Sequence, residues 1–194
     1  ASYFARDNHV LVVDDASRMG VENNIRQLGQ LKVDFIQANI SSFVILKKIF
    51  DQFNPDIVIH MAAQVAVTSS IANPVKDFRA NILGSFNLLE LARLRKDKPI
   101  MLFASTNKVY GSKNVSMELK DGRYQMANPL GYGEETPLSF ETPYGCSKGA
   151  ADQYFLDYHR IYGVPTVVFR QSCIYGPHQY GLEDQGWIAW FSIC

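Results

Sequence analysis

Tyr144 and Lys148 are a pair whose side-chain chemistry and spacing suggest catalysis. They lie four positions apart in a segment that reads as a helix, so both side chains project from one face, one turn apart. A phenol has a reference pKa of ~10 and is a weak base at neutral pH unless a nearby cation stabilises its phenolate. Lys148 would supply that cation. The alternative is a tyrosine packed against the aliphatic stem of a lysine.

Three further polar residues follow short apolar runs. Thr106 comes just after residues 99–104, where its hydroxyl can bond a reacting oxygen or simply end a strand. Asp14 follows residues 10–13, where an acid can bind the ribose of an adenosine, although Asp-Asp-Ala-Ser is also good turn chemistry. His60 ends a third run, and we interpret it as a buried structural histidine.

The elements that would position these residues alternate between β-branched runs and segments of helical period, which indicates an α/β fold. The runs predict strands over residues 10–13, 33–36, 56–60, 99–104 and 166–170. Helices are predicted over 43–53, from the Asn73-Pro74 cap to about 89, and over 142–162. The polar stretch 111–142 is expected to be a long irregular loop, and the end of the chain beyond Gly176 is expected to be loop-like.

The expected fold is a doubly wound, Rossmann-like parallel sheet with right-handed crossovers. The run 56–60 is almost wholly apolar, which predicts a strand covered on both faces. Ligands of such sheets bind beyond the carboxyl ends of the strands. We therefore expect Asp14 and residues 60–64, 105–108 and 170–174 to converge on one rim.

Composition and charge argue against several classes of binding partner. The 194 residues carry 19 Lys+Arg and 19 Asp+Glu, which gives no basic footprint for nucleic acid or an anionic membrane. No run approaches the ~18 apolar residues of a membrane span. The 3 cysteines and 4 histidines are scattered, so we expect no metal site, and a reducing, cytoplasmic location fits best.

Four segments, taken together, resemble the extended short-chain dehydrogenase/reductase family of NAD-dependent sugar-nucleotide epimerases and dehydratases. They are His60-Met-Ala-Ala-Gln64, Phe103-Ala-Ser-Thr-Asn-Lys-Val-Tyr-Gly111, Tyr144-Gly-Cys-Ser-Lys148 and Phe169-Arg-Gln-Ser-Cys-Ile-Tyr-Gly176. Within that family, residues 105–111, residues 147–154 and Asp184-Gln-Gly-Trp187 look like the branch of CDP-paratose 2-epimerases.

The resemblance implies bound NAD and a nucleotide-diphosphate sugar as substrate. It implies Thr106, Tyr144 and Lys148 as catalytic residues: a hydroxyl that orients the sugar oxygen, an acid/base, and a lysine that bonds the nicotinamide ribose. Tyr144 and Lys148 would also contact the cofactor, together with Asp14, Asp15, Ser17, Arg18, Asn39, Ile40, Ala62, Ala63 and Gln64. The residues implied at the substrate are Gln64, Thr106, Asn107 and Ser172.

The chain departs from the family pattern at its ends. Residues 1–8 resemble the end of the first family helix, so the first strand with its glycine-rich loop and most of the carboxyl-terminal substrate subdomain are expected to be missing. We therefore assign residues 1–176 to an NAD-binding domain and 177–194 to the start of a substrate-binding subdomain. His178 stands where many members carry arginine. A homo-oligomer is possible.

Asn107-Lys108 distinguishes epimerisation from dehydration. The family's 4,6-dehydratases need an Asp-Glu pair there as acid and base for water elimination, and this chain lacks that pair. The expected reaction is an epimerisation in which NAD takes a hydride and returns it to the opposite face of the sugar. A UDP-sugar 4-epimerase, another enzyme of the family and a non-catalytic fragment remain as alternatives.

Overall fold

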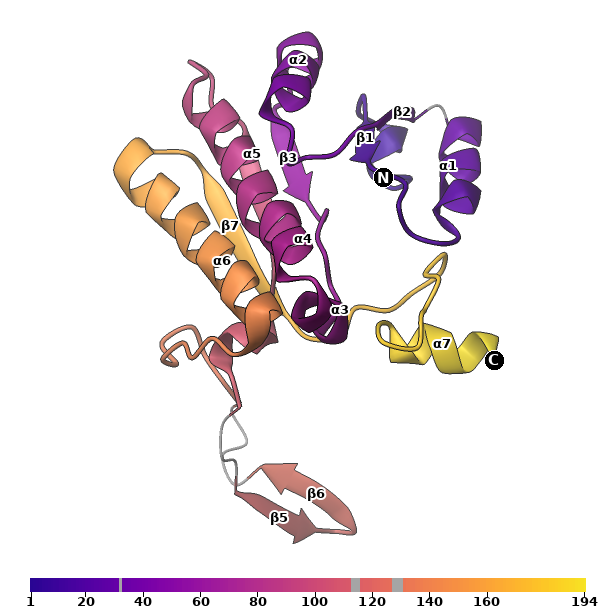
Figure 1. Ribbon diagram of the computed structural model, residues 1–194, viewed down its shortest axis with the longest axis vertical. Coiled ribbons are helices and arrows are strands. Elements are labelled where there is room, and N and C mark those ends of the chain that lie inside the picture. The colour runs from indigo at the N-terminus through magenta and orange to yellow at the C-terminus, as the bar shows by residue number, and fades with distance from the viewer. Residues whose placement is uncertain (32, 113–115, 127–130) are drawn as a thin grey trace.

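The computed structural model describes residues 1–31, 33–112, 116–126 and 131–194. It contains a two-stranded parallel sheet, β1 (Leu11–Asp14) with β2 (Asp34–Gln37), and a three-stranded parallel sheet in the order β3 (Ile57–His60), β4 (Ile100–Thr106), β7 (Thr166–Gln171) (Figure 1). The five predicted strands are confirmed to within two residues at each end. The α/β fold with parallel strands and flanking helices is confirmed, although the described strands divide into two sheets.

The helices α2, α4 and α6 begin at the signals present in the sequence. The bounds are α1 (Val21–Gln30), α2 (Phe43–Phe53), α3 (Val67–Ala72), α4 (Pro74–Phe78), α5 (Gly84–Arg93), α6 (Thr142–Tyr162) and α7 (Trp187–Ile193). Asn73 caps α4, because its side chain accepts from the Lys76 N–H at 3.0 Å. A π-helical turn, Arg79–Leu83, joins α4 to α5. The helix α6 has the predicted bounds and ends at Gly163, whose φ of 64° suits glycine.

One hydrophobic core holds the three-stranded sheet against α2, α5 and α6. Phe103 of β4 and Phe155 of α6 are stacked at its centre, with ring centroids 4.5 Å apart. Ile40, after β2, belongs to the same core and lies against Gly84 of α5. A Cβ on Gly84 would come within 2.5 Å of the Ile40 side chain, so this contact requires glycine. The core thereby fixes the segment that follows β2.

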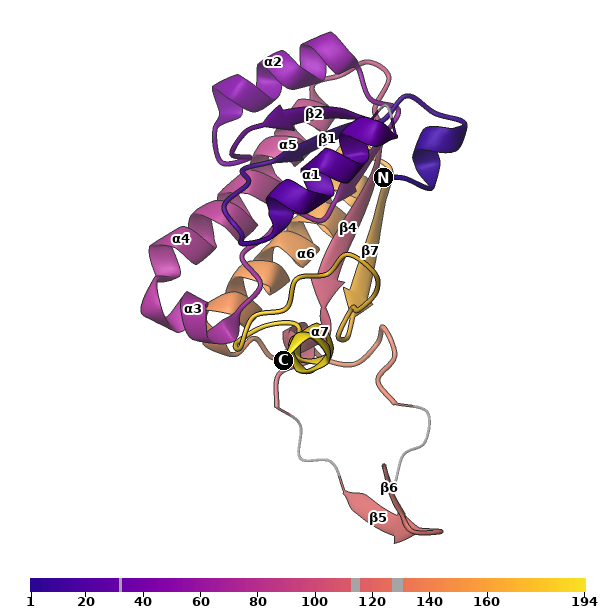
Figure 2. The ribbon, with the colours of Figure 1, turned by 90° about the vertical axis from the view of Figure 1, so that its right-hand side faces the viewer.

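The helices α5 and α6 lie on the same side of β4 and β7 (Figure 2). The chain runs from β3 through β4 to β7 in one direction across the sheet, so successive right-handed crossovers place their helices on one face. On the other face Ile57 and Ile59 are 54% and 45% exposed. The expectation that this strand is covered on both faces is therefore wrong for the described residues.

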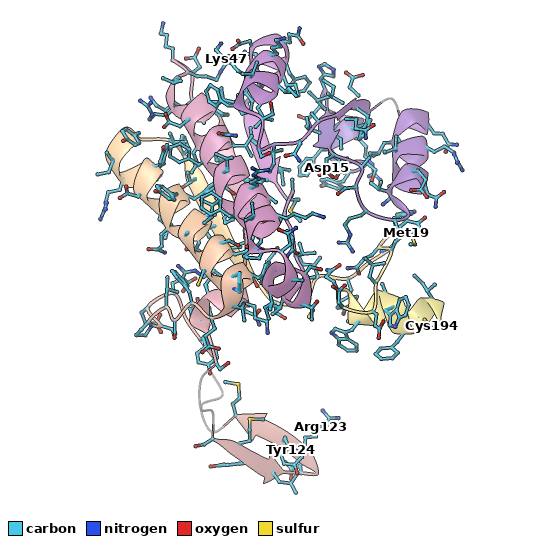
Figure 3. All side chains as sticks on the ribbon, viewed as in Figure 1. Asp15, Met19, Lys47, Arg123, Tyr124 and Cys194 are labelled. Atoms are coloured by element: carbon cyan, nitrogen blue, oxygen red, sulfur yellow. The ribbon has the colours of Figure 1, made fainter. Side chains whose placement is uncertain are left out.

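The loop expected over 111–142 contains a hairpin, so a wholly irregular loop was a wrong prediction. Its strands, β5 (Met117–Lys120) and β6 (Arg123–Met126), pair antiparallel around Asp121-Gly122, which have φ angles of 52° and 74°. Asp-Gly between alternating residues is a strong hairpin signal. Arg123 and Tyr124 lie on this hairpin, away from the sheet (Figure 3). The helices α1 and α3 and the short helix α7 were also not predicted.

Candidate active site

Tyr144 lies in the first turn of α6 and is buried. Its backbone N–H donates to the Ser70 hydroxyl at 3.1 Å, and its carbonyl accepts from the Ser147 hydroxyl at 3.1 Å. Its phenol is hydrogen-bonded to the side chain of Thr106, which is buried at the carboxyl end of β4. The structure thus brings Thr106 and Tyr144 together from elements separated by the whole 111–142 segment.

Lys148 is one turn further along α6 and is also buried. Its Nζ donates to the Ala104 carbonyl at 2.6 Å and lies 4.2 Å from the centre of the Phe103 ring. Burial lowers the pKa of Lys148 to about 8, against the opposing effect of the Asp152 and Asp77 charges. The ammonium uses one donor on Ala104, which leaves two for another ligand.

The pKa of Tyr144 differs from the simple expectation that Lys148 lowers it. Burial raises the pKa of Tyr144, the hydrogen bond from Thr106 opposes that rise, and the charge of Asp77 adds to it. The physical reason is that Lys148 Nζ donates a hydrogen bond to the Ala104 carbonyl at the buried end of β4. The phenol is therefore held protonated, as an acid, until a further positive charge or donor reaches it.

Gln64 lies on the loop after β3, and its side chain is engaged within that loop. Its Oε1 accepts from the Ala66 N–H at 2.5 Å, and its Nε2 donates to the Ala66 carbonyl at 2.8 Å. Its backbone N–H and carbonyl both bond the side chain of Asn81, in the π-helical turn. Gln64 is thus placed beside the site, with its side chain holding the entry to α3. The same loop carries Ala62 and Ala63, which are half-buried.

Asp14 and its neighbours form a tight turn at the end of β1. Asp14 Oδ1 accepts from the Ala16 N–H at 2.7 Å, and Asp15 Oδ1 accepts from the Ser17 N–H at 3.0 Å. Asp15 lies on the β1 side of the loop that leads to α1 (Figure 3). Arg18 donates to the Gln185 side chain at 2.7 Å, so the carboxyl-terminal segment reaches this turn. The turn and ribose interpretations of Asp14 are compatible, because the turn uses a single carboxylate oxygen in these bonds.

The remaining predicted residues lie beyond other strand ends. Asn39 is exposed and its Oδ1 accepts from the Ser41 N–H, whereas Ile40 is buried in the core. Asn107 and Ser172 directly follow β4 and β7 and are exposed. The predicted residues therefore lie at or after strand ends, in two separate sheets. Several of the polar ones make their hydrogen bonds within their own loops.

Two buried groups complete the surroundings of Lys148. His60 Nε2 is 2.8 Å from the Ser85 hydroxyl, which itself donates to the Asn81 carbonyl, so Nε2 carries the hydrogen. Burial, with a smaller effect of the Lys148 charge, lowers the pKa of His60 to about 3. The interpretation of His60 as a buried structural histidine is confirmed.

Asp152 and Arg170 form a buried ion pair that sequence reasoning missed. Arg170 Nη2 and Nε donate to the two carboxylate oxygens at 2.9 and 3.0 Å, and Ser105 donates to the same carboxylate at 2.7 Å. The signal was available, because Asp152 is one helical turn beyond Lys148 on the same face. This pair ties α6 to the ends of β4 and β7.

The donor set suits a dinucleotide lying across the strand ends. An acid follows β1, small residues follow β3, and a lysine with two further donors stands beside a threonine and tyrosine at the end of β4.

In the described residues, no helix is both long and apolar enough to cross a membrane.

Comparison with known proteins places the chain in a family. A family model described as GDP-mannose 4,6 dehydratase matches residues 3–183. The chain belongs to that family. Among the curated relatives that the chain resembles is CDP-paratose 2-epimerase of Salmonella typhi, which is 43% identical over 94% of this chain and 55% of its own length. The family resemblance expected from the sequence is confirmed.

Solved structures of similar fold agree with the family assignment. UDP-glucose 4-epimerase of Thermotoga maritima, solved with UDP-glucose, is 29% identical with a TM-score of 0.78 over 96% of this chain and 55% of that one. UDP-glucose 4-epimerase of Thermus thermophilus, solved with NAD, is 31% identical with a TM-score of 0.77 over 97% and 55%. The chain spans about half the length of the curated relatives it matches.

Proposed function

We propose that this chain is the NAD-binding and catalytic part of a sugar-nucleotide epimerase similar to CDP-paratose 2-epimerase. The observation that carries the proposal is the hydrogen-bonded pair of Thr106 and Tyr144 with Lys148 one turn away, all buried at one strand end. The 43% identity to CDP-paratose 2-epimerase supports the choice of branch.

The same residues fit NAD as the cofactor. NAD, when bound, supplies a reversible acceptor for the sugar's hydride, which epimerisation requires because substrate and product share one oxidation level. Asp14 would accept hydrogen bonds from a free ribose hydroxyl and repel a 2′-phosphate, which favours NAD over NADP. Arg18 could pair with a phosphate, but its guanidinium bonds Gln185. Asp15 and Ser17 would lie around the adenosine ribose, and Asn39 and Ile40 beside the adenine. Ala62 and Ala63 would line the cofactor and the sugar.

The chain's own residues would then move the proton. Tyr144 removes the proton of the sugar hydroxyl during oxidation and returns it during reduction, while Thr106 bonds the same oxygen. Lys148 bonds the cofactor ribose with its two remaining donors and brings its charge toward the phenol. That charge opposes the burial that otherwise raises the pKa of Tyr144.

Substrate contacts would come from Gln64, Asn107 and Ser172, which surround the strand ends, and from residues 177–194 as the start of a substrate-binding subdomain. Asp184 in that segment accepts from the hydroxyls of Thr68 and Ser69, at 2.9 and 3.1 Å. This contact places the segment beside α3, whose Ser70 holds Tyr144. The 4,6-dehydratase alternative lacks its acid pair, since Asn107-Lys108 follows Thr106.

The proposed partners are a nucleotide-diphosphate sugar as substrate and, in a homo-oligomer, a second copy of the chain. The three cysteines Cys146, Cys173 and Cys194 are free and exposed, which suits a reducing compartment such as the cytoplasm.

A panel of CDP- and UDP-hexoses tests the proposal. The protein is incubated with NAD and each sugar nucleotide, and proton NMR follows inversion at each carbon. We expect inversion at carbon 2 of a CDP-hexose. Inversion at carbon 4 of a UDP-hexose would assign the 4-epimerase alternative, and release of water with a 4-keto-6-deoxy product would assign a dehydratase.

A further inference from the structure

Asp77 is a buried carboxylate that the proposed proton transfer does not use. It lies in α4 and is 1% exposed. Its Oδ1 accepts from Asn81 Nδ2 at 3.1 Å and from Gln64 Nε2 at 3.3 Å. Both donors are neutral amides. They bond the carboxylate without cancelling its charge.

The hydrogen bonds of Asp77 lead through Asn81 to the first turn of α6, which carries Tyr144. Asn81 Nδ2 also donates to Ser147 Oγ at 3.0 Å, and Ser147 donates to the Tyr144 carbonyl at 3.1 Å. Through Asn81 the same cluster holds the backbone of Gln64. One carboxylate therefore connects the loop after β3 with the first turn of α6.

The charge of Asp77 acts on the same residues. It raises the pKa of Lys148 and of Tyr144, and Lys148 in turn lowers the pKa of Asp77 against the effect of burial. The other charged or titratable groups near Lys148 are Asp152 on its own helix and His60 on β3. With the pKa of Lys148 at about 8, loss of one neighbouring negative charge would leave much of the lysine neutral at working pH.

We propose that Asp77 is a positioning residue that fixes the Tyr144 turn against the Gln64 loop and keeps the buried Lys148 ammonium charged. This inference rests on the proposed function only in treating Tyr144 and Lys148 as the catalytic pair. Asp77 itself touches neither substrate nor the reacting atoms in this role.

The charge is tested by NMR titration of the two residues without substrate. Signals of 13C-labelled lysine and tyrosine are assigned by their loss in Lys148→Met and Tyr144→Phe. Asp77→Asn should lower both titration midpoints. The control, Asp51→Asn, removes an exposed helix charge paired with Lys47 and should shift neither. Unchanged midpoints in folded Asp77→Asn would overturn the proposal.

A reciprocal measurement covers the case in which Asp77→Asn does not fold. Because coupling between two sites is mutual, Lys148→Met must raise the pKa of the Asp77 carboxyl. An unmoved Asp77 titration would overturn the electrostatic role.

The positioning role is tested by amide hydrogen exchange in Asp77→Ala. Exchange at the N–H groups of Tyr144 and Gln64 should accelerate at least tenfold relative to wild type, and Asp51→Asn should leave both unchanged. Equal exchange in Asp77→Ala and wild type would overturn it. None of these readouts needs turnover, so an inactive wild-type protein would contradict the proposed function and leave the Asp77 results standing.

Discussion

The backbone N–H of Tyr144 donates a hydrogen bond to the hydroxyl of Ser70, 74 positions earlier in the chain, at 3.1 Å. Ser70 is fully buried, and its hydroxyl donates a hydrogen bond to the Val67 carbonyl at 2.7 Å. An N–H in the first turn of a helix has no partner within the helix. Ser70 therefore supplies that partner and fixes the start of α6 on α3.

Ser70→Ala should destabilise the protein by about 1–3 kcal/mol, because it leaves the buried Tyr144 N–H without an acceptor. The matched control is Ser69→Ala, which removes an exposed hydroxyl bonded to Asp184 and should cost less than about 0.5 kcal/mol. Urea denaturation of the two variants provides the measurement. Equal losses would mean that the Ser70 bond contributes nothing specific.

The placement of Tyr144 and Lys148 on one helix was predictable because it depends on local spacing. Tyr144 and Lys148 share a face of any helix, and Thr142-Pro143 marks the start of this one. The partners that hold the turn were not predictable, since Ser70, Asp77 and Asn81 meet it only through tertiary packing of α3, α4 and the π-helical turn.

The burial of the strands likewise depends on tertiary packing that the sequence does not show. Each strand was visible as an apolar run, but whether a run is covered on one or both faces depends on where the crossover helices lie. Ile57 and Ile59 look equivalent to Val58 in sequence, yet only Val58 packs against the core. The hairpin was missed for a different reason. Its turn signal, Asp121-Gly122, is present in the sequence, but no hairpin was predicted there.

Tyr144→Phe should lower turnover by about 10²–10⁴-fold and leave NAD binding nearly unchanged, since it removes the acid/base group and keeps the ring. Tyr154→Phe is the control on the same helix, where the side chain is half exposed and far along from the first turn. Steady-state kinetics and calorimetry with NAD measure the two effects. Near-normal turnover in Tyr144→Phe would remove Tyr144 from the mechanism.

Arg170→Met should destabilise the protein by about 3–5 kcal/mol, because it leaves the fully buried Asp152 carboxylate without its cation. As a control, Arg160→Met breaks an ion pair with Asp157 on the surface of α6, the helix that carries Asp152. It should lower the free energy of unfolding by about 1 kcal/mol or less. Chemical denaturation compares them. A loss at Arg170 no larger than that at Arg160 would show that Asp152 finds other compensation.

His60 should make stability depend on pH. Its pKa is about 3 in the folded protein and ~6.5 in the unfolded chain, so below ~6.5 the unfolded state binds one more proton. Stability is therefore lost as pH falls from ~6.5 toward ~3. Between pH 7 and pH 5 the wild type should lose about 2 kcal/mol more than His60→Gln, which cannot titrate. Parallel stability curves for the two proteins would contradict the burial of a neutral imidazole.

In the proposed mechanism, hydride leaves the sugar and returns to the same carbon while Tyr144 carries only the hydroxyl proton. Turnover of CDP-paratose in heavy water, followed by NMR of the product, tests it most directly, because a hydride held within the enzyme never exchanges with solvent. We expect product epimerised at carbon 2 with no deuterium on that carbon. Deuterium at carbon 2 in proportion to product would show that a carbon-bound proton is removed instead, and would contradict the hydride mechanism.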